Sequence, residues 1–380
     1  MKHSVQTKLI QTGTRQFNQS IINPIFQSAI YEYDGNSYGK LKYSRFNNTP
    51  NHITLSRKLA LLENAEAAIV TASGMSAIST TLFSILKAGD HILISDGLYG
   101  GTYYFVLEDL SRFNVQFDFV NLNEPGTWRE KIRPNTRAFY VEGIANPLSG
   151  VGDLEEVVRL SRAFGLISVI DNTIPTPYNF KAVEFGFDLS LHSCTKYLNG
   201  HSDIVAGAIL GSASLVEKIS HTLLHFGGTL DPHTCFLLER GLKTFPLRMK
   251  YQNESALRIA NFLHNHPKVR VVHFPGLESH PGHKLAKNLF SGFSGFMSFE
   301  LHADLYQTKQ FISNLTIPIE SVSLGGPETL IIQPAATTHS LVEPVTRMKM
   351  GISDTLIRLS VGLEDTNDLI DDISSALEQI

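Results

Sequence analysis

Short apolar runs recur between residues 67 and 210, and helical patterns separate many of them. The runs have four to six residues each and lie at 67–70, 91–95, 115–120, 137–142, 166–171, 187–192 and 205–210. Continuous apolar runs of this length are typical of strands that are buried on both faces. Two intervening segments, 75–89 and 154–165, instead repeat apolar side chains at helical spacing. The alternation predicts an α/β fold with a seven-stranded, mostly parallel sheet that helices cover on both faces.

Glycine residues mark the expected ends of these two helices. Gly89 lies in "KAGD" and Gly165 lies in "AFGL", each directly after the helical pattern. A glycine in this place commonly closes a helix because it adopts the left-handed conformation without strain. Further along, residues 236–267 carry one long helical pattern.

The last third of the chain has a different texture from the part before it. Short apolar runs at 269–274 and 295–301 are mixed with helical patterns, and an amphipathic helix is expected at 368–380. The first residues are polar, rich in Asn, Gln and Ser, and show little periodicity. We therefore predict an N-terminal arm at 1–46, a larger α/β domain at 47–250 and a smaller α+β domain at 251–380.

Composition and charge are those of a soluble globular protein. Hydrophobic residues make up 42% of the chain and charged residues 18%, which is far from the balance of a disordered segment. The net charge is −4, and lysine and arginine form no basic run. We therefore expect neither a nucleic-acid partner nor an anionic membrane surface.

Cysteine usage and the absence of long apolar segments indicate a cytoplasmic protein. The chain has two cysteines, Cys194 and Cys235, and so sparse a count is typical of a reducing compartment. Residues 1–16 lack the apolar stretch of a secretory signal, and no run approaches the ~20 residues that a membrane helix needs.

Polar groups follow the ends of three predicted strands, where ligands bind in open parallel sheets. After the first run, Ser73, Gly74 and Met75 open a helix. Bare backbone N–H groups at a helix start form a natural phosphate seat, although an ordinary capped helix start has the same sequence. After the fifth run comes Asp171, which either meets a cationic partner or makes local turn hydrogen bonds. After the sixth come Ser193 and Thr195, two hydroxyls that flank the approach to Lys196.

These groups together are those that pyridoxal phosphate requires. Its aldehyde needs a lysine for a Schiff base, its pyridine nitrogen a carboxylate, and its phosphate hydroxyl and N–H groups. A lone lysine is normally a solvated charge, but its neighbours here favour Lys196 as the Schiff-base lysine. The glycine fingerprint of dinucleotide-binding enzymes is missing, which argues against hydride transfer. The arm is short and nearly uncharged, which argues against a fused DNA-binding module.

The segment "DLSLHSCTKYLNGHSD" (188–203) closely resembles the lysine-site signature of the pyridoxal-phosphate enzymes of cysteine and methionine metabolism, the transsulfuration enzymes. Further matches run in order through the chain: "YSR" (43–45), "SGMSAI" (73–78), "LYGGT" (98–102), "DNT" (171–173), "RGLKT" (240–244), "SLGGPETL" (323–330) and "IRLSVGLED" (357–365). The resemblance implies the fold-type I pyridoxal-phosphate transferase architecture and a homotetramer, a dimer of dimers with shared active sites.

The resemblance also implies roles for individual residues. Lys196 would bind the cofactor and move protons, Asp171 would pair with the ring nitrogen, and the phosphate would lie against Gly74, Met75, Ser193 and Thr195. Tyr43 and Arg45 would reach the phosphate from a neighbouring subunit.

On the substrate side, Tyr99 would stack on the cofactor ring and take part in proton transfer. Arg358 would bind the substrate α-carboxylate through its planar fork, with Asn146 and Ser323 beside it. Each role has an alternative: Tyr99 as a packed core aromatic, and Arg358 as a surface arginine on an amphipathic strand.

The activity that the resemblance implies is γ-elimination or γ-replacement on sulfur amino acids or activated homoserine, as in cystathionine γ-lyase and γ-synthase. Cystathionine β-lyase, homoserine sulfhydrylase and methionine γ-lyase activities are the alternatives. Gly101 stands where methionine γ-lyases typically carry cysteine, and Leu324 where one bacterial type of β-lyase has tryptophan. Lys42, directly before "YSR", suits an anionic distal group on the substrate unless it turns into solvent.

The histidines and cysteines do not predict further chemistry. The spacings of His192, His201, His280, His283 and His339 match no zinc pattern, so we expect no metal. Cys194 is predicted to be a small buried residue rather than a nucleophile.

Overall fold

The larger of two sheets has seven strands and forms the centre of the molecule. In a computed structural model, the described residues are 3–14, 16–33, 35, 41–338, 340 and 343–380. The strand order is β1 (Ala67–Thr71), β7 (Gly207–Gly211), β6 (Leu189–Ser193), β5 (Ile167–Asp171), β4 (Thr136–Glu142), β2 (His91–Ser95) and β3 (Gln116–Val120). Six of its strands run parallel to one another, and β7, between β1 and β6, runs antiparallel to them. The predicted seven-stranded, mostly parallel sheet is confirmed.

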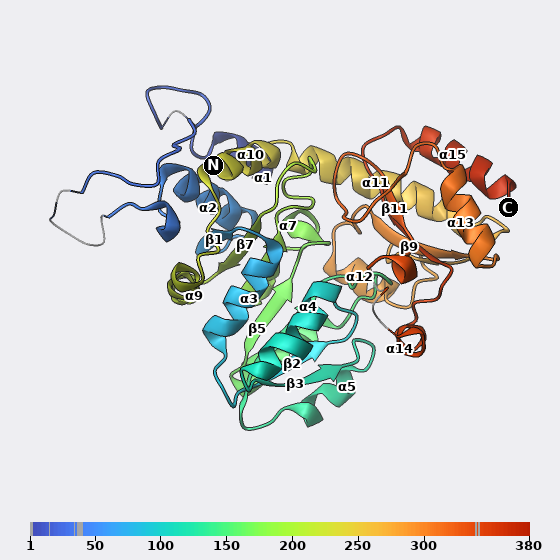
Figure 1. Cartoon of the computed structure of the whole chain (residues 1–380), viewed down its shortest axis with the longest axis horizontal. Coiled ribbons are helices and arrows are strands. Elements are labelled where there is room, and N and C mark those ends of the chain that lie inside the picture. The colour runs from blue at the N-terminus through green and yellow to red at the C-terminus, as the bar shows by residue number, and fades with distance from the viewer. Residues whose placement is uncertain (1–2, 15, 34, 36–40, 339, 341–342) are drawn as a thin grey trace.

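Helices cover both faces of this sheet, as the continuous apolar strands predicted (Figure 1). One apolar cluster joins the strands to α3 (Gly74–Ile85), α9 (Ala213–Phe226) and the π-helical turn Phe105–Leu110. A second cluster, on the other face, includes α2 (Pro50–Glu63), α6 (Leu154–Phe164) and α10 (Pro232–Leu242). Neighbouring strand residues divide between the two clusters, with Ile92 and Ile94 in the first and Leu93 in the second.

A second, smaller sheet lies beside the first and confirms the expected α+β part. Its order is β10 (Ile319–Glu320), β11 (Leu330–Ile332), β12 (Leu356–Ser360), β9 (Phe296–Leu301) and β8 (Val269–His273). Its apolar cluster also takes side chains from α11 (Phe245–His264), α13 (Leu305–Asn314) and α15 (Thr366–Glu378). The shorter elements are α4 (Gly100–Tyr104), α5 (Pro125–Trp128), α7 (Thr176–Asn179), α8 (Ala182–Phe185), α12 (His283–Leu289), α14 (Pro344–Lys349), η4 (Arg129–Lys131) and η5 (Pro334–Ala336).

The single long helix expected at 236–267 is wrong, because two helices, α10 and α11, occupy this stretch. Pro246 explains the break. Proline has no N–H to donate to the carbonyl of Leu242, so α10 ends there and Pro246 falls in the first turn of α11, where no such bond is needed. The predicted domain boundary after residue 250 lies inside α11 and stays a prediction.

Of the two glycine helix ends, one is confirmed and one is wrong. Gly165 closes α6 with a φ of +65°. The helix α3 instead ends at Ile85, where Leu86 turns to an extended conformation and is buried in the apolar cluster. Gly89, with a φ of +86°, lies in the turn that leads to β2.

The segment before α2 contains a helix that the sequence pattern did not reveal. The helix α1 (Val5–Gln11) begins at Ser4, whose hydroxyl accepts a hydrogen bond from the Thr7 N–H. It buries Leu9, whose carbonyl accepts a bond of 2.9 Å from the buried Lys58. A short 3-10 turn, η2 (Ser44–Phe46), ends the segment. Its described parts between these elements project from the body of the molecule (Figure 1).

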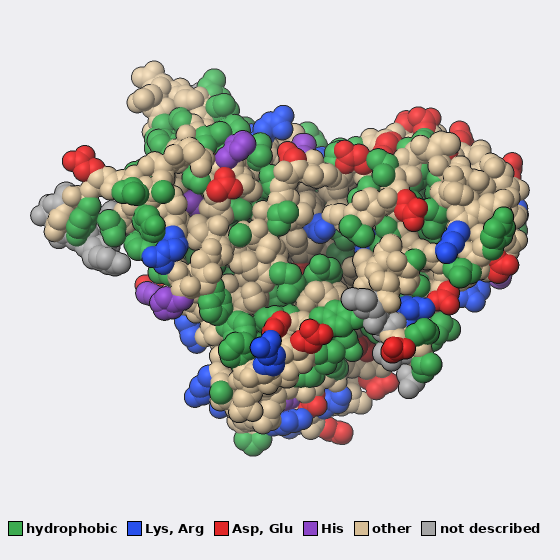
Figure 2. Space-filling model, viewed as in Figure 1, with side chains coloured by type: hydrophobic (Ala, Val, Ile, Leu, Met, Phe, Trp, Pro, Cys, Tyr) green, Lys and Arg blue, Asp and Glu red, His purple; other side chains and the backbone are tan. Residues whose placement is uncertain are grey.

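The surface mixes charges of both signs. On the face shown in Figure 2, lysine and arginine side chains lie among acidic ones rather than in a single basic field. No helix within the described ranges has both the length and the apolar character that crossing a bilayer requires.

Candidate active site

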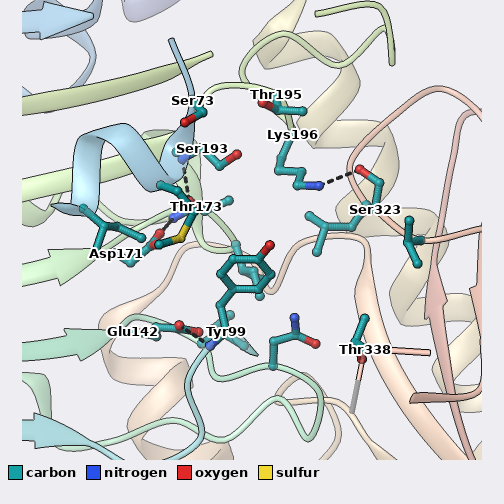
Figure 3. A pocket seen from close by; sticks show the side chains of 18 of the residues that line it. Ser73, Tyr99, Glu142, Asp171, Thr173, Ser193, Thr195, Lys196, Ser323 and Thr338 are labelled. Carbon is teal, nitrogen blue, oxygen red and sulfur yellow. Dashed lines mark hydrogen bonds between the residues drawn. The ribbon is translucent and has the colours of Figure 1, made fainter. Parts of the chain in front are cut away.

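A cavity of about 450 Å³ opens at the carboxyl ends of the central strands. It is bounded by the starts of α3 and α4 on one side and by the segment before β11 and β12 of the smaller sheet on the other. Ten residues to which the sequence analysis gave a catalytic or binding role line it together: Gly74, Met75, Tyr99, Asn146, Asp171, Ser193, Thr195, Lys196, Ser323 and Arg358. Residues from distant parts of the chain therefore meet at one site (Figure 3).

The start of α3 forms a tightly packed turn at one wall of this cavity. The Ser73 hydroxyl caps the helix by accepting a bond of 3.0 Å from the Ser76 N–H. A Cβ at Gly74 would lie 2.8 Å from the Cβ of Ser193, so only glycine fits here without a shift. The first N–H groups of a helix have no partner within it. Together with the helix dipole, they make this wall suitable for a phosphate group.

Hydrogen bonds to neighbouring segments hold Ser193 and Thr195, the two hydroxyl residues before the lysine, in place. The backbone N–H of Ser193 donates to the Thr173 hydroxyl at 2.8 Å. The hydroxyl of Thr195 accepts from the Ala206 N–H at 3.0 Å and donates to the Ala206 carbonyl at 3.2 Å. These bonds hold the strand end of β6 against its neighbours and place both residues on the cavity wall.

Lys196 extends into the cavity toward the smaller sheet. Its Nζ donates a hydrogen bond of 2.6 Å to the Ser323 hydroxyl (Figure 3). Burial, together with the nearby positive charge of Arg358, lowers the pKa of Lys196 to about 8. Ser323 has a φ of +96°, a conformation that non-glycine residues rarely adopt and that concentrates at functional sites.

Two carboxyl groups end neighbouring strands at the opposite wall. Asp171 on β5 and Glu142 on β4 are paired in register. Burial raises the pKa of Asp171, although a bond of 3.0 Å from the Thr173 N–H opposes the rise. Burial raises the pKa of Glu142 well above its usual range, and the adjacent Asp171 adds to the effect. The sequence reasoning missed Glu142, yet it ends the run at 137–142 and the rule that found Asp171 applies to it equally.

Arg358 on β12 supplies a buried cation at the cavity. Its Nη2 donates to the Ser323 carbonyl at 2.8 Å and its Nη1 to the Asn146 Oδ1 at 3.5 Å. The side chain is 3% exposed, and burial lowers its pKa to about 10. The alternative of a surface arginine is therefore wrong. A carboxylate that enters the cavity meets a guanidinium whose direction is already fixed.

Tyr99 is not a packed core aromatic, because 46% of it is exposed. Its ring stands between the side of the cavity that holds Asp171 and the side that holds Ser323 (Figure 3). Leu324, Thr173 and Thr338 also line the cavity, and of these only Leu324 had been singled out from the sequence.

Tyr43 and Arg45 do not line the cavity of their own chain. Arg45 Nη1 instead donates a bond of 2.7 Å to the Leu224 carbonyl near the end of α9, and its guanidinium lies over the Tyr43 ring. Lys42 is exposed. The roles expected of Tyr43 and Arg45 require a second chain. These roles, and the one expected of Lys42, stay predictions.

The histidines serve structural contacts where the structure describes them. The His192 Nε2 lies 2.7 Å from the buried Glu63 carboxylate, the His201 Nδ1 2.7 Å from the Asn199 carbonyl and the His283 Nδ1 2.8 Å from the Pro275 carbonyl. Burial lowers the pKa of His280 to about 4. His339 lies outside the described residues, and within them no three His, Cys, Asp or Glu side chains group as metal ligands do. Cys194 is fully buried, as predicted.

The donor set fits pyridoxal phosphate. A glycine-dependent helix start with two hydroxyls faces the cavity from one wall, and a buried carboxylate and a lysine of lowered pKa lie within the same space. Lysine, carboxylate and phosphate seat are the three features by which a protein holds this cofactor.

Comparisons with known proteins also identify pyridoxal-phosphate enzymes, and the matches extend over nearly the whole chain. The model of the Cys/Met metabolism PLP-dependent enzyme family matches residues 6–378. An L-methionine γ-lyase of Fusobacterium nucleatum subsp. polymorphum is 38% identical, over 100% of this chain and 99% of its own length. A cystathionine β-lyase of Lactococcus lactis subsp. cremoris is also 38% identical, over 99% of both chains.

A solved structure matches equally fully. The crystal structure of cystathionine γ-lyase from Lactobacillus plantarum complexed with L-serine superposes with a TM-score of 0.95. The two proteins are 34% identical, and the match covers 100% of this chain and 99% of the other. The fold inferred from the strand pattern is therefore that of a pyridoxal-phosphate-dependent lyase.

Proposed function

Because the chain belongs to the Cys/Met metabolism PLP-dependent enzyme family, we propose that it is a carbon–sulfur lyase or γ-substituting transferase acting on sulfur amino acids or activated homoserine. The reaction we favour is γ-elimination, as in cystathionine γ-lyase. The observation that carries the proposal is the meeting of Lys196, Asp171 and Arg358 at one cavity beside the start of α3.

In this proposal each wall of the cavity has a task. The start of α3, with Ser193 and Thr195, would bind the cofactor phosphate. Asp171 would pair with the ring nitrogen, and Lys196 would bind the aldehyde carbon. When bound, pyridoxal phosphate supplies an electron-withdrawing ring conjugated to the substrate Cα. Arg358 would bind the substrate α-carboxylate, because its guanidinium is buried beside Asn146 and oriented by the Ser323 carbonyl.

The protein then has to move protons, and in this proposal Lys196 does so. A pKa of about 8 leaves a substantial fraction of the amine neutral near pH 7.5, so its Nζ can take the proton from the substrate Cα. For γ-elimination a second proton leaves Cβ and the γ-substituent departs as a thiol. Hydrolysis of the remaining four-carbon fragment yields 2-oxobutyrate and ammonia. The phenol of Tyr99, which stands in the cavity, is the second candidate for proton transfer.

We also propose a cytoplasmic homotetramer, a dimer of dimers with shared active sites. Both cysteines are free and buried, which fits a reducing compartment. Large apolar side chains of the arm, including Ile21, Ile22 and Ile30, are exposed on a single chain, which favours their burial by another copy.

The experiment that tests the proposed function is product analysis with L-cystathionine in the presence of pyridoxal phosphate. Cysteine with 2-oxobutyrate is the expected result, whereas homocysteine with pyruvate would establish β-elimination instead. Lys196→Ala should lose the visible absorbance band of the bound cofactor, and Lys218→Ala, a change of an exposed lysine on α9, should keep it. A wild-type protein that stays colourless after addition of the cofactor would overturn the proposal.

A further inference from the structure

Tyr99 occupies a position where its backbone decides the direction of its ring. It is the residue before α4, with φ −53° and ψ 133°, so it is not itself helical. Its carbonyl accepts the Tyr103 N–H at 3.0 Å, which ties the residue to the first turn of the helix. The ring beyond it stands in the cavity and is partly exposed.

Glu142 contacts the backbone of Tyr99. Its Oε1 accepts a hydrogen bond of 2.6 Å from the Tyr99 N–H (Figure 3). Glu142 is the last residue of β4, a strand inside the seven-stranded sheet, and only 4% of it is exposed. The acceptor is therefore fixed by a rigid element, and it pins a backbone group at the start of a short helix.

Gly101 confines the ring from the other side. A Cβ at Gly101 would lie 2.5 Å from the Cε1 and 3.2 Å from the Cδ1 of Tyr99, and 3.0 Å from the Met75 Sδ. The phenol ring thus packs against bare backbone, and any larger residue at 101 would push it aside. The ring direction depends on two features, the acceptor at Glu142 and the missing side chain at Gly101.

We propose that Glu142 is a positioning residue that fixes Tyr99 in the cavity through the Tyr99 backbone N–H. Gly101, which has no side chain, leaves the space that the Tyr99 ring occupies. The consequence for turnover rests on the proposed function, whereas the contact itself does not. Burial and the adjacent Asp171 favour the neutral acid at Glu142. A neutral acid still accepts through its carbonyl oxygen, so glutamine should replace it well.

Hydrogen exchange of the Tyr99 amide in the cofactor-free protein tests the contact without any assay of activity. Glu142→Leu fills a similar volume but has no acceptor, and we expect the Tyr99 amide to exchange at least about tenfold faster in this variant. Glu142→Gln should keep the protection. Glu108→Ala, an exposed glutamate on the π-helical turn that follows α4, is the matched control and should leave the amide unchanged.

Kinetics then test the consequence. Glu142→Leu should lower kcat/KM for the substrate found to turn over by about tenfold, mainly through kcat, and Glu142→Gln should restore it. Gly101→Ala should lower kcat in the same direction while the Tyr99 amide stays protected, because it moves the ring and not the backbone bond.

Two results would overturn the inference. One is unchanged exchange of the Tyr99 amide in Glu142→Leu, and the other is a loss of protection in Glu142→Gln as large as in Glu142→Leu. If Glu142→Leu unfolds, the less disruptive Glu142→Gln and Gly101→Ala still discriminate, since protection must survive in both. A wild-type protein without any lyase activity would defeat the proposed function and leave the exchange result valid.

Discussion

At the scale of single residues, burial controls the chemistry of the charged groups at the cavity. It lowers the pKa of the two cations, Lys196 and Arg358, and raises the pKa of the two acids, Asp171 and Glu142. Each shift disfavours the charged form, which is the expected effect of removing a charge from water. Such shifts cluster at active sites, and a pKa of about 8 lets Lys196 exchange protons near neutral pH.

The lowered pKa of Lys196 predicts how fast the cofactor-free protein captures pyridoxal phosphate covalently. The attacking amine must be neutral, and raising the pH deprotonates it. The rate should therefore rise from pH 6 and level off above a midpoint near pH 8, instead of near the ordinary lysine value of 10.5. Stopped-flow absorbance measures this rate. Arg358→Leu removes a positive charge that lowers this pKa, so its midpoint should lie higher, and a rate that keeps rising to pH 10 in the wild type would contradict the prediction.

Single-residue reasoning from the sequence found most of this site because its residues follow strand ends. The rule that ligands meet the carboxyl ends of parallel strands led to Asp171 and Lys196, and the cavity contains both. The rule was not applied to the run that ends in Glu142, so that acid was missed. Thr338 comes from the segment after β11, and no local pattern shows that it faces a cavity, whereas Leu324 was singled out through the resemblance alone.

At the scale of elements, the apolar runs predicted the strands well, whereas the helical patterns and their glycines predicted the ends of helices poorly. A strand that is buried on both faces needs apolar residues at consecutive positions. The apolar runs therefore located all seven strands of the larger sheet to within two residues of their bounds. Helix ends depend on single competing contacts. Pro246 divided the pattern at 236–267, and the burial of Leu86 ended α3 before its glycine. The seven-residue α1 is too short for a periodic signal.

A buried, hydrogen-bonded carboxylate joins α2 to the strands below the cavity. Glu63, at the end of α2, accepts bonds from Ser190 and His192 on β6 at 2.7 Å and from Asn172 after β5 at 3.0 Å. Burial alone would raise the pKa of Glu63, but the bond and charge of His192 outweigh it and hold the pKa below the ordinary value of 4.5. The contact therefore ties a helix to the two strands that carry Asp171 and Lys196 at their ends.

We predict that Glu63→Ala lowers the free energy of unfolding by about 3–5 kcal/mol, because it leaves a buried polar cluster without its acceptor. Urea unfolding at pH 7 measures the loss, with the exposed Glu130→Ala as control. The folded pKa lies below the unfolded one, so this stabilisation is present above about pH 4.5 and is lost as the pH falls through the folded pKa. The difference in free energy of unfolding between wild type and variant should thus become smaller in acid. A difference that is the same at every pH would contradict the lowered pKa of Glu63.

At the scale of the whole molecule, a single chain leaves apolar side chains uncovered at several places, and two of these are the arm and the cavity. Ile21 and Ile30 on the arm are 74% and 75% exposed, and hydrophobic side chains are visible on the projecting segment in Figure 2. At the cavity, Val205 and Val322 are also exposed although they line it. Tyr43 and Arg45 lie outside the cavity of their own chain. A second copy that covers both places would bring an arm to each cavity, and association then becomes a condition of activity.

Mixing two inactive variants tests whether the active site is shared between chains. Lys196→Ala removes the amine from the cavity of its own chain, and Arg45→Ala removes a group that, in a shared site, serves the cavity of the partner. A mixed dimer then has one cavity with both residues intact, so random mixing should restore about a quarter of the wild-type sites. If Arg45 served its own cavity, each cavity of the mixed dimer would keep one defect and no activity would return. Lys196→Ala mixed with Asp171→Ala is the matched control, because both residues line the same cavity and the mixture should stay inactive whatever the assembly.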